Sequence, residues 1–260
     1  MAEEKKDLVK APETALVATF GEGEQTGMED VRAADLVPPF LRILQKMSDA
    51  CDPDKEGYLP DAKPGMFYQS DSKELLDEVL LIPCVYKPSM VERKLLPDGK
   101  VDMNSFVAEH PVGSEAGLAR TDTGAYLLPN GNCLDDTRTW FCLRVISPNE
   151  VVPVIVPMRS TQIKVSKRWF TELHQFKAQG KAGAFRPPMY VHLYKGTSVA
   201  EDNEKGSWRS WVLNRVRVLE PGKDDALFNM AKEAHTMFNQ WAASTAKPMV
   251  EGAGGDQTPF

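Results

Sequence analysis

The chain has 260 residues, of which 42% are hydrophobic, and carries a formal net charge of −6. A chain of this size can bury one core of ordinary size, so we expect one main domain. No apolar run is long enough to cross a membrane, and the N-terminal residues lack the apolar stretch of a signal peptide, so the sequence predicts a cytoplasmic protein with no membrane contact. The four cysteines are widely spaced, which predicts free thiols. The overall acidity argues against general binding to duplex DNA.

The N-terminal third combines an arm without apolar periodicity and the start of the domain. Residues 1–34 are rich in Glu, Lys, Ala, Gly and Thr, which predicts a mobile arm. In residues 35–47, two prolines precede Leu41, Leu44 and Met47 at helical spacing. We therefore expect a short helical segment that docks one apolar face on the core. A turn-rich segment and a strand at 66–69 should follow.

The middle of the chain is dominated by strand patterns. Residues 78–86 are a continuous apolar run with Pro83 inside it, which predicts a sheet edge or a bulge. Residues 91–96 fit a partner strand, and residues 99–137 fit hairpins and long loops. The runs 137–146 and 151–158, joined by a short turn, predict a hairpin.

The C-terminal half alternates between helix and strand patterns. After Met158, Ser160 or Thr161 can cap a helix. Two strands are expected at 189–195 and 207–219, joined by a polar loop, and a final helix at 224–241. Most elements are therefore strands joined by turns, which favours a mainly β fold with appended helices, an antiparallel OB-like barrel, over a parallel α/β sheet. The predicted organisation is an arm (1–34), a domain (35–243) and a flexible tail (244–260).

Basic and aromatic residues are concentrated between positions 159 and 217. That window carries a charge of +8, so the remainder of the chain carries −14. Cations bind phosphates and flat rings stack on unpaired bases, which together indicate a groove for a single nucleic-acid strand. The candidate nucleic-acid-binding residues are Arg159, Lys164, Lys167, Arg168, Trp169, Tyr194, Arg209, Trp211, Arg215 and Arg217.

The strand at 207–219 contains two tryptophans. Trp208 and Trp211 cannot share a face of a regular strand, because their separation is odd. The alternation places Trp211 with Arg209, Arg215 and Arg217, and valines define most of the opposite, apolar face. We therefore expect an exposed Trp211 that serves as a base-stacking platform. The alternative is that the aromatic residues belong to the core and that only the cations face solvent.

The end of the chain, Pro259-Phe260, resembles that of single-stranded DNA-binding proteins of bacteria and phages. These have an OB-fold core and a flexible tail that ends in an aromatic residue with acidic neighbours. The resemblance implies that the tail recruits replication or recombination proteins through Pro259 and Phe260, although it holds only Glu251 and Asp256 where the family has a run of acids. Short blocks at 40–45, 159–169 and 205–208 are also similar to those of a phage-encoded family among replication and recombination proteins.

The sequence thus predicts a bacteriophage-type single-stranded DNA-binding protein that coats strands stoichiometrically, without a cofactor, a metal or catalytic residues. Its partners would be single-stranded DNA, replication or recombination proteins and further copies of the chain. One alternative is a phage structural or replication-complex module that binds another protein. A second is a metal-dependent nuclease, because Asp61, Asp71 and Lys73 resemble a nuclease motif in which carboxylates hold the cation. Other common enzyme motifs are missing from the sequence.

Overall fold

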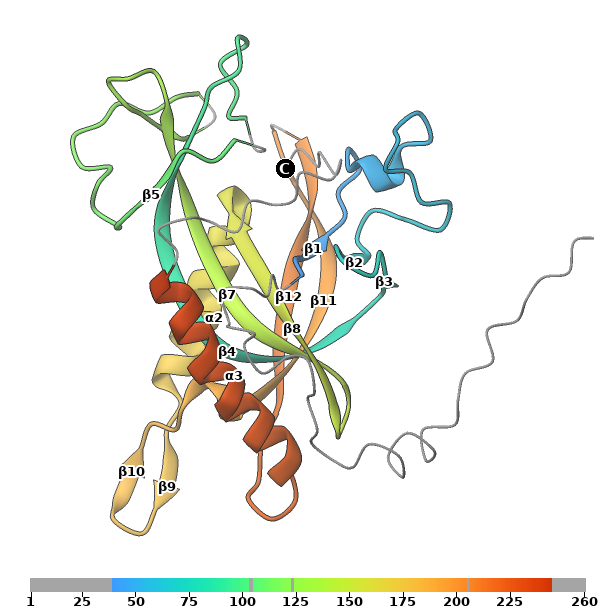
Figure 1. The fold of residues 1–260 in the computed structure, drawn as a ribbon, viewed down its shortest axis with the longest axis vertical. Helices are drawn as coiled ribbons and strands as arrows, with labels where there is room; N and C mark the ends of the chain where they lie inside the picture. Colours follow the sequence, from blue (N-terminus) through green and yellow to red (C-terminus); the bar gives the residue numbers. More distant parts are fainter. Residues whose placement is uncertain (1–38, 103–104, 123, 205, 245–260) are drawn as a thin grey trace, which may run out of the picture. The chain divides into compact units, whose positions relative to one another are not determined.

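The described part of the chain is built on antiparallel β-strands accompanied by two α-helices (Figure 1). The computed structural model describes residues 39–102, 105–122, 124–204 and 206–244. These residues belong to the unit Val37–Phe260. The predicted arm at 1–34 and the tail beyond Ser244, with Pro259 and Phe260, lie outside the described residues.

The described elements follow one another along the chain as strands, short 3₁₀ helices (η) and α-helices. They are β1 (Leu41–Ile43), η2 (Asp49–Cys51), β2 (Phe67–Gln69), β3 (Leu75–Leu76), β4 (Val79–Arg93), β5 (Ala108–His110), β6 (Tyr126–Leu127), β7 (Cys133–Ser147), β8 (Glu150–Arg159), η3 (Ser160–Gln162), α2 (Ile163–Gln175), β9 (Ala178–Gly180), β10 (Gly183–Phe185), η4 (Met189–Val191), β11 (His192–Asn203), β12 (Gly206–Val218) and α3 (Asp225–Ser244).

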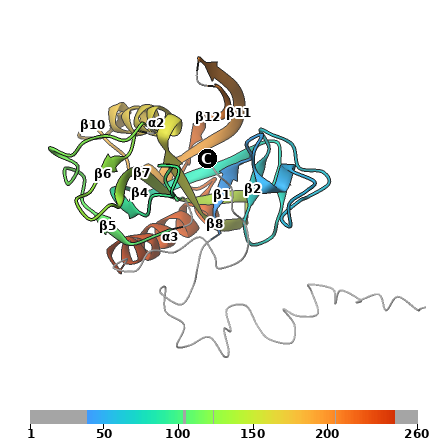
Figure 2. The ribbon, with the colours of Figure 1, turned by 90° about the horizontal axis from the view of Figure 1, so that it is seen from above.

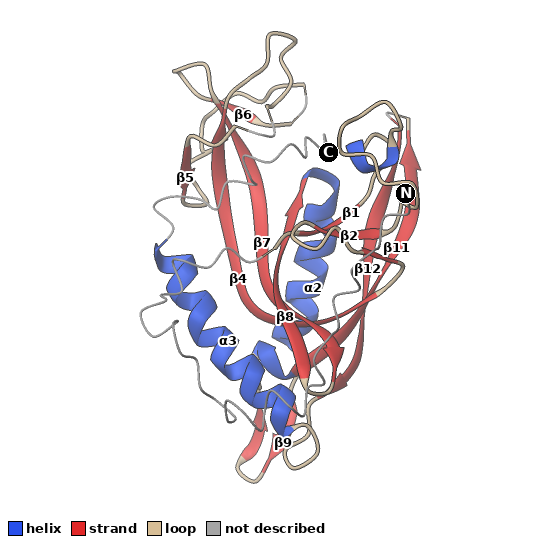
Figure 3. Cartoon of the chain, turned by 45° about the vertical axis from the view of Figure 1, so that its right-hand side comes forward, coloured by secondary structure: helices blue, strands red, loops and turns tan. Residues whose placement is uncertain are grey.

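The main sheet is built around two long, curved strands, β4 and β7 (Figure 3). They pair antiparallel from Leu81 to Arg93 of β4. The other edge of β4 pairs with β11 near its start and with β5 near its end. The other edge of β7 pairs with β6 and β8, and β11 pairs with β12. The principal strands therefore lie side by side in the order β8, β7, β4, β11, β12.

The two outer strands of this order, β8 and β12, are not joined by a ladder in the described part of the chain. The OB-like barrel expected from the sequence is therefore not confirmed. Ile155 of β8 instead donates its N–H to the carbonyl of Pro39, at 2.8 Å. The Gln45 side chain donates to the carbonyl of Arg209 at 3.0 Å and accepts its N–H at 2.8 Å, and Gln162 donates to the same carbonyl at 2.9 Å. Two glutamine amides thus satisfy the backbone N–H and carbonyl of Arg209 at the edge of β12, which in a closed sheet would bond to another strand.

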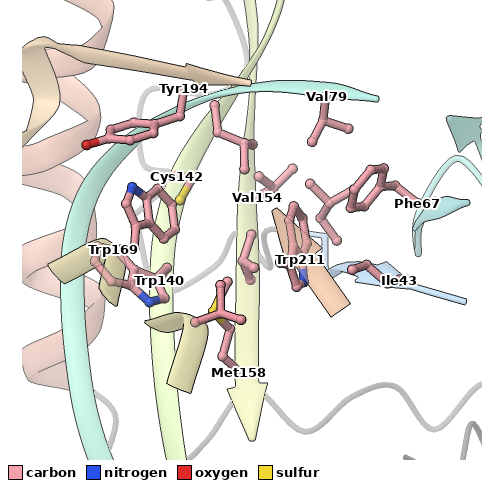
Figure 4. Close-up of a cluster of buried hydrophobic side chains, with 14 of the residues drawn as sticks. Ile43, Phe67, Val79, Trp140, Cys142, Val154, Met158, Trp169, Tyr194 and Trp211 are labelled. Atoms are coloured by element: carbon pink, nitrogen blue, oxygen red, sulfur yellow. The ribbon is translucent and has the colours of Figure 1, made fainter. Parts of the chain in front are cut away.

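The core on one side of the main sheet is a chain of aromatic contacts (Figure 4). Trp169 of α2 stacks on Trp140 of β7 with ring centroids 4.0 Å apart, and Tyr194 meets Trp169 edge-on at 5.4 Å. Trp211 of β12 packs against Phe67 of β2 at 4.5 Å. This core connects α2, the main sheet and the small sheet β1–β2–β3.

The two helices lie on opposite faces of β7 (Figure 2). Successive residues of a strand point to opposite sides, and Trp140 packs on Trp169 of α2 whereas Phe141 packs on Phe238 of α3, at 5.6 Å. Both faces of this strand are consequently buried near its middle. No helix in the described ranges is long and apolar enough to span a membrane.

Several sequence-based predictions of elements are confirmed. The hairpin of β7 and β8, the helix α2 and the terminal helix α3 form where expected. The bulge predicted at Pro83 is present, since the register between β4 and β7 shifts between Pro83 and Val85.

Three other predictions were wrong. Leu41–Ile43 is a strand and not part of a helix, because it pairs with β2 and buries all three of its residues. Residues 91–93 continue β4 and do not form its partner, which is β7. The expected loop 196–206 is mostly ladder, because β11 remains paired with β12 as far as Asn203. The side chains of this two-stranded ribbon are mostly polar because both of its faces are exposed to solvent, so the sequence pattern resembled that of a loop.

Candidate nucleic-acid interface

The three aromatic residues proposed as base-stacking platforms lie in the core. Trp169, Tyr194 and Trp211 are 2%, 0% and 4% exposed. Arg209, Trp211 and Arg215 share one face of β12, as the alternation predicted, but at Trp211 that face turns toward the core. The expected exposure of Trp211 was therefore wrong. The register with β11 shifts between Arg215 and Arg217, so the predicted alternation does not extend to Arg217, which is exposed. Alternation identifies which residues share a face, but the curvature of the sheet decides which face is inside.

Close packing around Trp211 confirms that it is a core residue. A Cβ atom on Gly196 of the neighbouring strand β11 would lie 2.9 Å from the Trp211 ring and 2.9 Å from Val79 Cγ2. Such distances are too short for carbon atoms, so the ring lies over the glycine backbone. Trp211 cannot leave this position to meet a base without opening the core.

The two arginines near the end of β12 have partners within the chain. Arg215 is 2.8 Å from Glu172 of α2, and its guanidinium lies 4.3 Å from the Phe176 ring centroid. Arg217 forms an ion pair with Asp224, with Nη2 to Oδ1 at 2.7 Å. A phosphate would have to compete with these carboxylates, so Arg215 and Arg217 are weaker candidates than the sequence suggested.

Helix α2 presents three of the predicted cations to solvent. Lys164, Lys167 and Arg168 are exposed, while Trp169 on the same helix is buried. Trp140 Nε1 donates to the Ser166 hydroxyl at 2.8 Å and fixes the rotation of the helix. A buried apolar stripe thus anchors the helix and keeps the cations on its outer side.

A pocket of about 230 Å³ lies where the ends of β8 and η3 meet β1 and the start of β12. Among the described residues that line it are three cations and no carboxylate. The lining residues are Arg42, Ile43, Gln45, Lys46, Met47, Pro157, Arg159, Ser160, Thr161, Gln162, Ser207, Trp208 and Trp211. The lining therefore combines cations, hydroxyl groups and the half-buried Trp208 indole.

Positive charge is concentrated behind one wall of this pocket. Arg42 and Arg159 are 5% and 7% exposed. Asp135 Oδ2 lies 3.8 Å from Arg159 Nη1 and 3.6 Å from Arg93 Nε. Burial, together with the charges of Arg93 and Arg42, lowers the pKa of Arg159 to about 9, and Asp135 only partly opposes this. Arg159 is still charged at neutral pH.

The backbone at the pocket adopts an uncommon conformation. Ser160, at the junction of β8 and η3, has a φ of 47°, which lies in the left-handed region that non-glycine residues rarely occupy. This turn places Ser160, Thr161 and Gln162 on the pocket wall. Strained residues of this kind cluster at functional sites.

Several pocket residues were not identified from the sequence. Arg42, Gln45 and Lys46 are more than a hundred positions away from the basic window, and only the pairing of Gln45 with Arg209 shows that they belong together. Trp208, assigned to the apolar face by its alternation, is half-buried at the pocket, and its Nε1 donates to Glu201 at 3.1 Å. The alternation separated Trp208 from Trp211 but assigned the exposed position to the wrong one of the two.

The residues of the nuclease-like motif show ordinary roles in turns. Asp71 accepts hydrogen bonds from the Gln69 side chain at 2.9 Å and from the Ser72 backbone at 2.7 Å. Within the described ranges, no group of three or more His, Cys, Asp or Glu side chains is placed to hold a metal ion.

Comparison with known proteins identifies one family. The model of the family described as "Pam3 phage gp34-like protein" matches residues 7–244 of the chain. Neither a curated protein nor a solved structure matches it.

Proposed function

The chain belongs to the Pam3 phage gp34-like protein family, and on that premise we propose that it is a phage single-stranded DNA-binding protein with an OB-type barrel. It would coat single strands during replication or recombination and would not be an enzyme. The family match places the chain among phage proteins, and the DNA-binding role is inferred from the arrangement of strands and charges.

The observation that carries the proposal is the connectivity of the main sheet. Three strands, β4, β7 and β8, are followed by the helix α2 and then by β11 and β12. The first strand of this series pairs with the second and the fourth, the second with the third, and the fourth with the fifth. An OB-fold is a partly open five-stranded Greek-key barrel, and this pairing supports an OB-type arrangement.

The pocket lies where such a fold would bind a strand. OB-folds bind oligonucleotides on the face of their second and third strands and with the loops that follow the first and fourth strands. The corresponding elements are β7, β8, the connection 94–132 and the tip of the β11–β12 hairpin, which extends away from the rest of the sheet in Figure 2. The pocket joins the end of β8 to the residues that directly follow this hairpin tip.

The chemistry of the exposed residues supports the same role. Lys164, Lys167 and Arg168 follow the pocket along α2 and could neutralise phosphates. Phe170 is 37% exposed and Trp208 is half-buried, so these two rings replace Trp211 as candidate stacking platforms. A net charge of −6 does not prevent this, because local charge governs an approaching strand within a Debye length of about 10 Å.

The proposal is tested by the fluorescence anisotropy of a labelled oligo-dT strand titrated with the protein at several salt concentrations, with a duplex of equal length as control. We expect tighter binding of the single strand and a logarithmic affinity that falls with salt by about 0.7 per neutralised phosphate. Absence of binding at low salt, or equal affinity for the duplex, would contradict the proposal.

A second candidate function is that of a module that binds another phage protein. Phe185, in the small β9–β10 hairpin, is 50% exposed, and exposed aromatic residues are common where proteins associate. This alternative would be favoured if the anisotropy experiment showed no affinity for either DNA.

A further inference from the structure

We propose that the small hairpin of β9 and β10 is a second contact for single-stranded DNA, with one base stacked on Phe185 and phosphates bound by its lysines. The inference rests on the proposed function, because the hairpin would hold the same strand that the main sheet and α2 bind. It goes beyond that function by assigning DNA contact to an element outside the main sheet.

The hairpin contributes little to the core of the protein. Among the described strands, β9 and β10 pair only with each other, and their ribbon projects away from the rest of the fold (Figures 1 and 3). Every residue from 179 to 185 is exposed. A two-stranded hairpin alone is marginally stable in water, so this element does not stabilise the fold. Both of its faces are accessible to a partner.

The base of the hairpin is fixed to the body of the protein. Before β9, the Phe176 ring lies 4.3 Å from the Arg215 guanidinium and meets the His192 ring edge-on, with centroids 4.9 Å apart. After β10, Arg186 Nε donates to the carbonyl of His174 at 2.8 Å. This carbonyl belongs to the last turn of α2, where helix carbonyls lack partners within the helix. The two strands therefore leave the body at fixed points beside the end of α2.

The hairpin carries positive charge without neighbouring carboxylates. Lys177, Lys181 and Arg186 are exposed, and the sequence from 173 to 200 contains neither Asp nor Glu. In the part of the chain that the structure describes, none of these three cations forms an ion pair, whereas Arg215 and Arg217 both do. A phosphate that approaches the hairpin therefore has no carboxylate to displace. This charge complements a nucleic-acid backbone.

One face of the hairpin presents an accessible aromatic ring. The pairing places Phe185 on a face whose other residues are all small, namely Ala178, Gly180 and Gly183. A Cβ atom on Gly180 would lie 3.1 Å from the Phe185 ring, so the ring lies close against the glycine backbone, yet the residue is 50% exposed. With such small neighbours, a flat base can reach the open side of the ring. This arrangement suits base stacking.

The hairpin continues the exposed cationic side of α2. Phe170 of this helix, which is 37% exposed, stacks on His174 with ring centroids 6.1 Å apart. The carbonyl of His174 accepts the hydrogen bond from Arg186, the neighbour of Phe185. A chain of contacts thus leads from one exposed ring to the other, and a strand bound along α2 would reach the hairpin. The bases of a duplex are already stacked and paired, so these rings favour a single strand.

Three substitutions of Phe185 test the stacking contact by anisotropy titrations of labelled oligo-dT with the full chain. Phe185→Ala should weaken single-strand binding by about tenfold, within the range of one stacking ring. Phe185→Leu keeps an apolar side chain without a ring and should bind as weakly, whereas Phe185→Trp keeps a ring and should bind at least as tightly as the unmodified protein. Thermal midpoints from circular dichroism should not change, because the residue lies on an exposed ribbon.

A charge variant with a matched control tests the phosphate contacts. Lys177→Gln combined with Lys181→Gln should reduce the slope of the salt dependence by about 1.4, the value of two neutralised phosphates on a single strand. Lys223→Gln combined with Lys232→Gln removes the same charge from exposed positions before and within α3 and should leave the slope unchanged. Arg186 is kept, because it holds the hairpin to α2.

The outcomes distinguish the hairpin contact from the function. If the unmodified protein binds oligo-dT and the hairpin variants bind it with the same affinity and slope, the hairpin contact is refuted and the DNA-binding function stands. If the unmodified protein does not bind oligo-dT at low salt, both fail, and a protein partner for the hairpin is favoured. Binding by Phe185→Leu as tight as that of the unmodified protein would refute stacking, and equal losses on a duplex would refute the preference for a single strand.

Discussion

Removing two exposed charges from α2 tests whether this helix contacts the DNA backbone. Lys164 and Arg168 are four residues apart, so they lie on the same side of the helix, and both are exposed. We expect the double variant Lys164→Gln, Arg168→Gln to bind single-stranded DNA more weakly while it keeps its fold. Glutamine has nearly the helix propensity of lysine and arginine, and neither residue is part of the buried stripe.

The size of the effect follows from counterion release. The logarithm of the affinity for a single strand falls by about 0.7 for each neutralised phosphate and tenfold increase in salt. Two lost contacts should therefore reduce the slope of the salt dependence by about 1.4. If the variant and the unmodified protein bind equally at about 1 M salt, the variant should bind roughly 25-fold more weakly at about 0.1 M salt. Anisotropy titrations of a labelled oligo-dT between 0.05 and about 0.5 M salt would measure both quantities.

A matched control separates contact from overall charge. The variant Lys223→Gln, Lys232→Gln removes the same charge from exposed positions before and within α3, on the other face of β7. Its salt slope should equal that of the unmodified protein. Equal losses in the two double variants would show that only net charge matters, and an unchanged slope in the Lys164 and Arg168 variant would refute the assignment of α2 to the interface.

Three further predictions concern the core and its pH dependence. Trp211→Ala should lower the free energy of unfolding by about 3–5 kcal/mol in urea titrations, as expected for a large core ring; a stable variant would show that the ring is dispensable for packing. Gly196→Ala should destabilise the protein by about 1–3 kcal/mol, because the new methyl group meets the Trp211 ring; a thermal midpoint equal to that of the parent would contradict this. Hydrogen bonds from Asn132, Asn130 and His110 hold the pKa of Glu92 below its usual value, against the opposing effect of burial. Because the folded-state pKa is the lower one, this stabilisation is present above the ordinary value of 4.5 and is lost as the pH falls through the folded-state value. Glu92→Gln should therefore flatten the decline of stability as the pH falls from 4.5 through the folded-state value, and an identical decline in both proteins would exclude Glu92 as its source.

The alternation in β12 shows how far the sequence predicts the site. It correctly grouped Trp211 with Arg209 and Arg215 on one face, because side chains alternate along a regular strand. It failed for Arg217, because the register with β11 shifts between Arg215 and Arg217. The inference that the arginine-bearing face of β12 must be exposed to solvent was wrong, since Trp211 on that face is buried. Arg215 reaches a carboxylate on α2, while Trp211 on the same face packs in the core. A long arginine side chain near the edge of a buried face can extend its guanidinium group out of the core, so an arginine does not identify the exposed face of a strand.

Local patterns determined much of the architecture of this protein. Apolar runs of strand length, a short turn and helical periodicity were sufficient to place the β7–β8 hairpin, α2 and α3, because each depends on neighbours close in sequence. The concentration of cations in residues 159–217 was likewise visible in the sequence alone. Only the tertiary structure decided which cations are accessible, because burial and ion pairing are set by partners far along the chain. It also brought Arg42 and Lys46 to Arg159 and Trp208 to form the pocket. The two glutamine side chains that hold this arrangement bond to a backbone more than 40 residues away in one case and 164 in the other, a separation that no local pattern encodes.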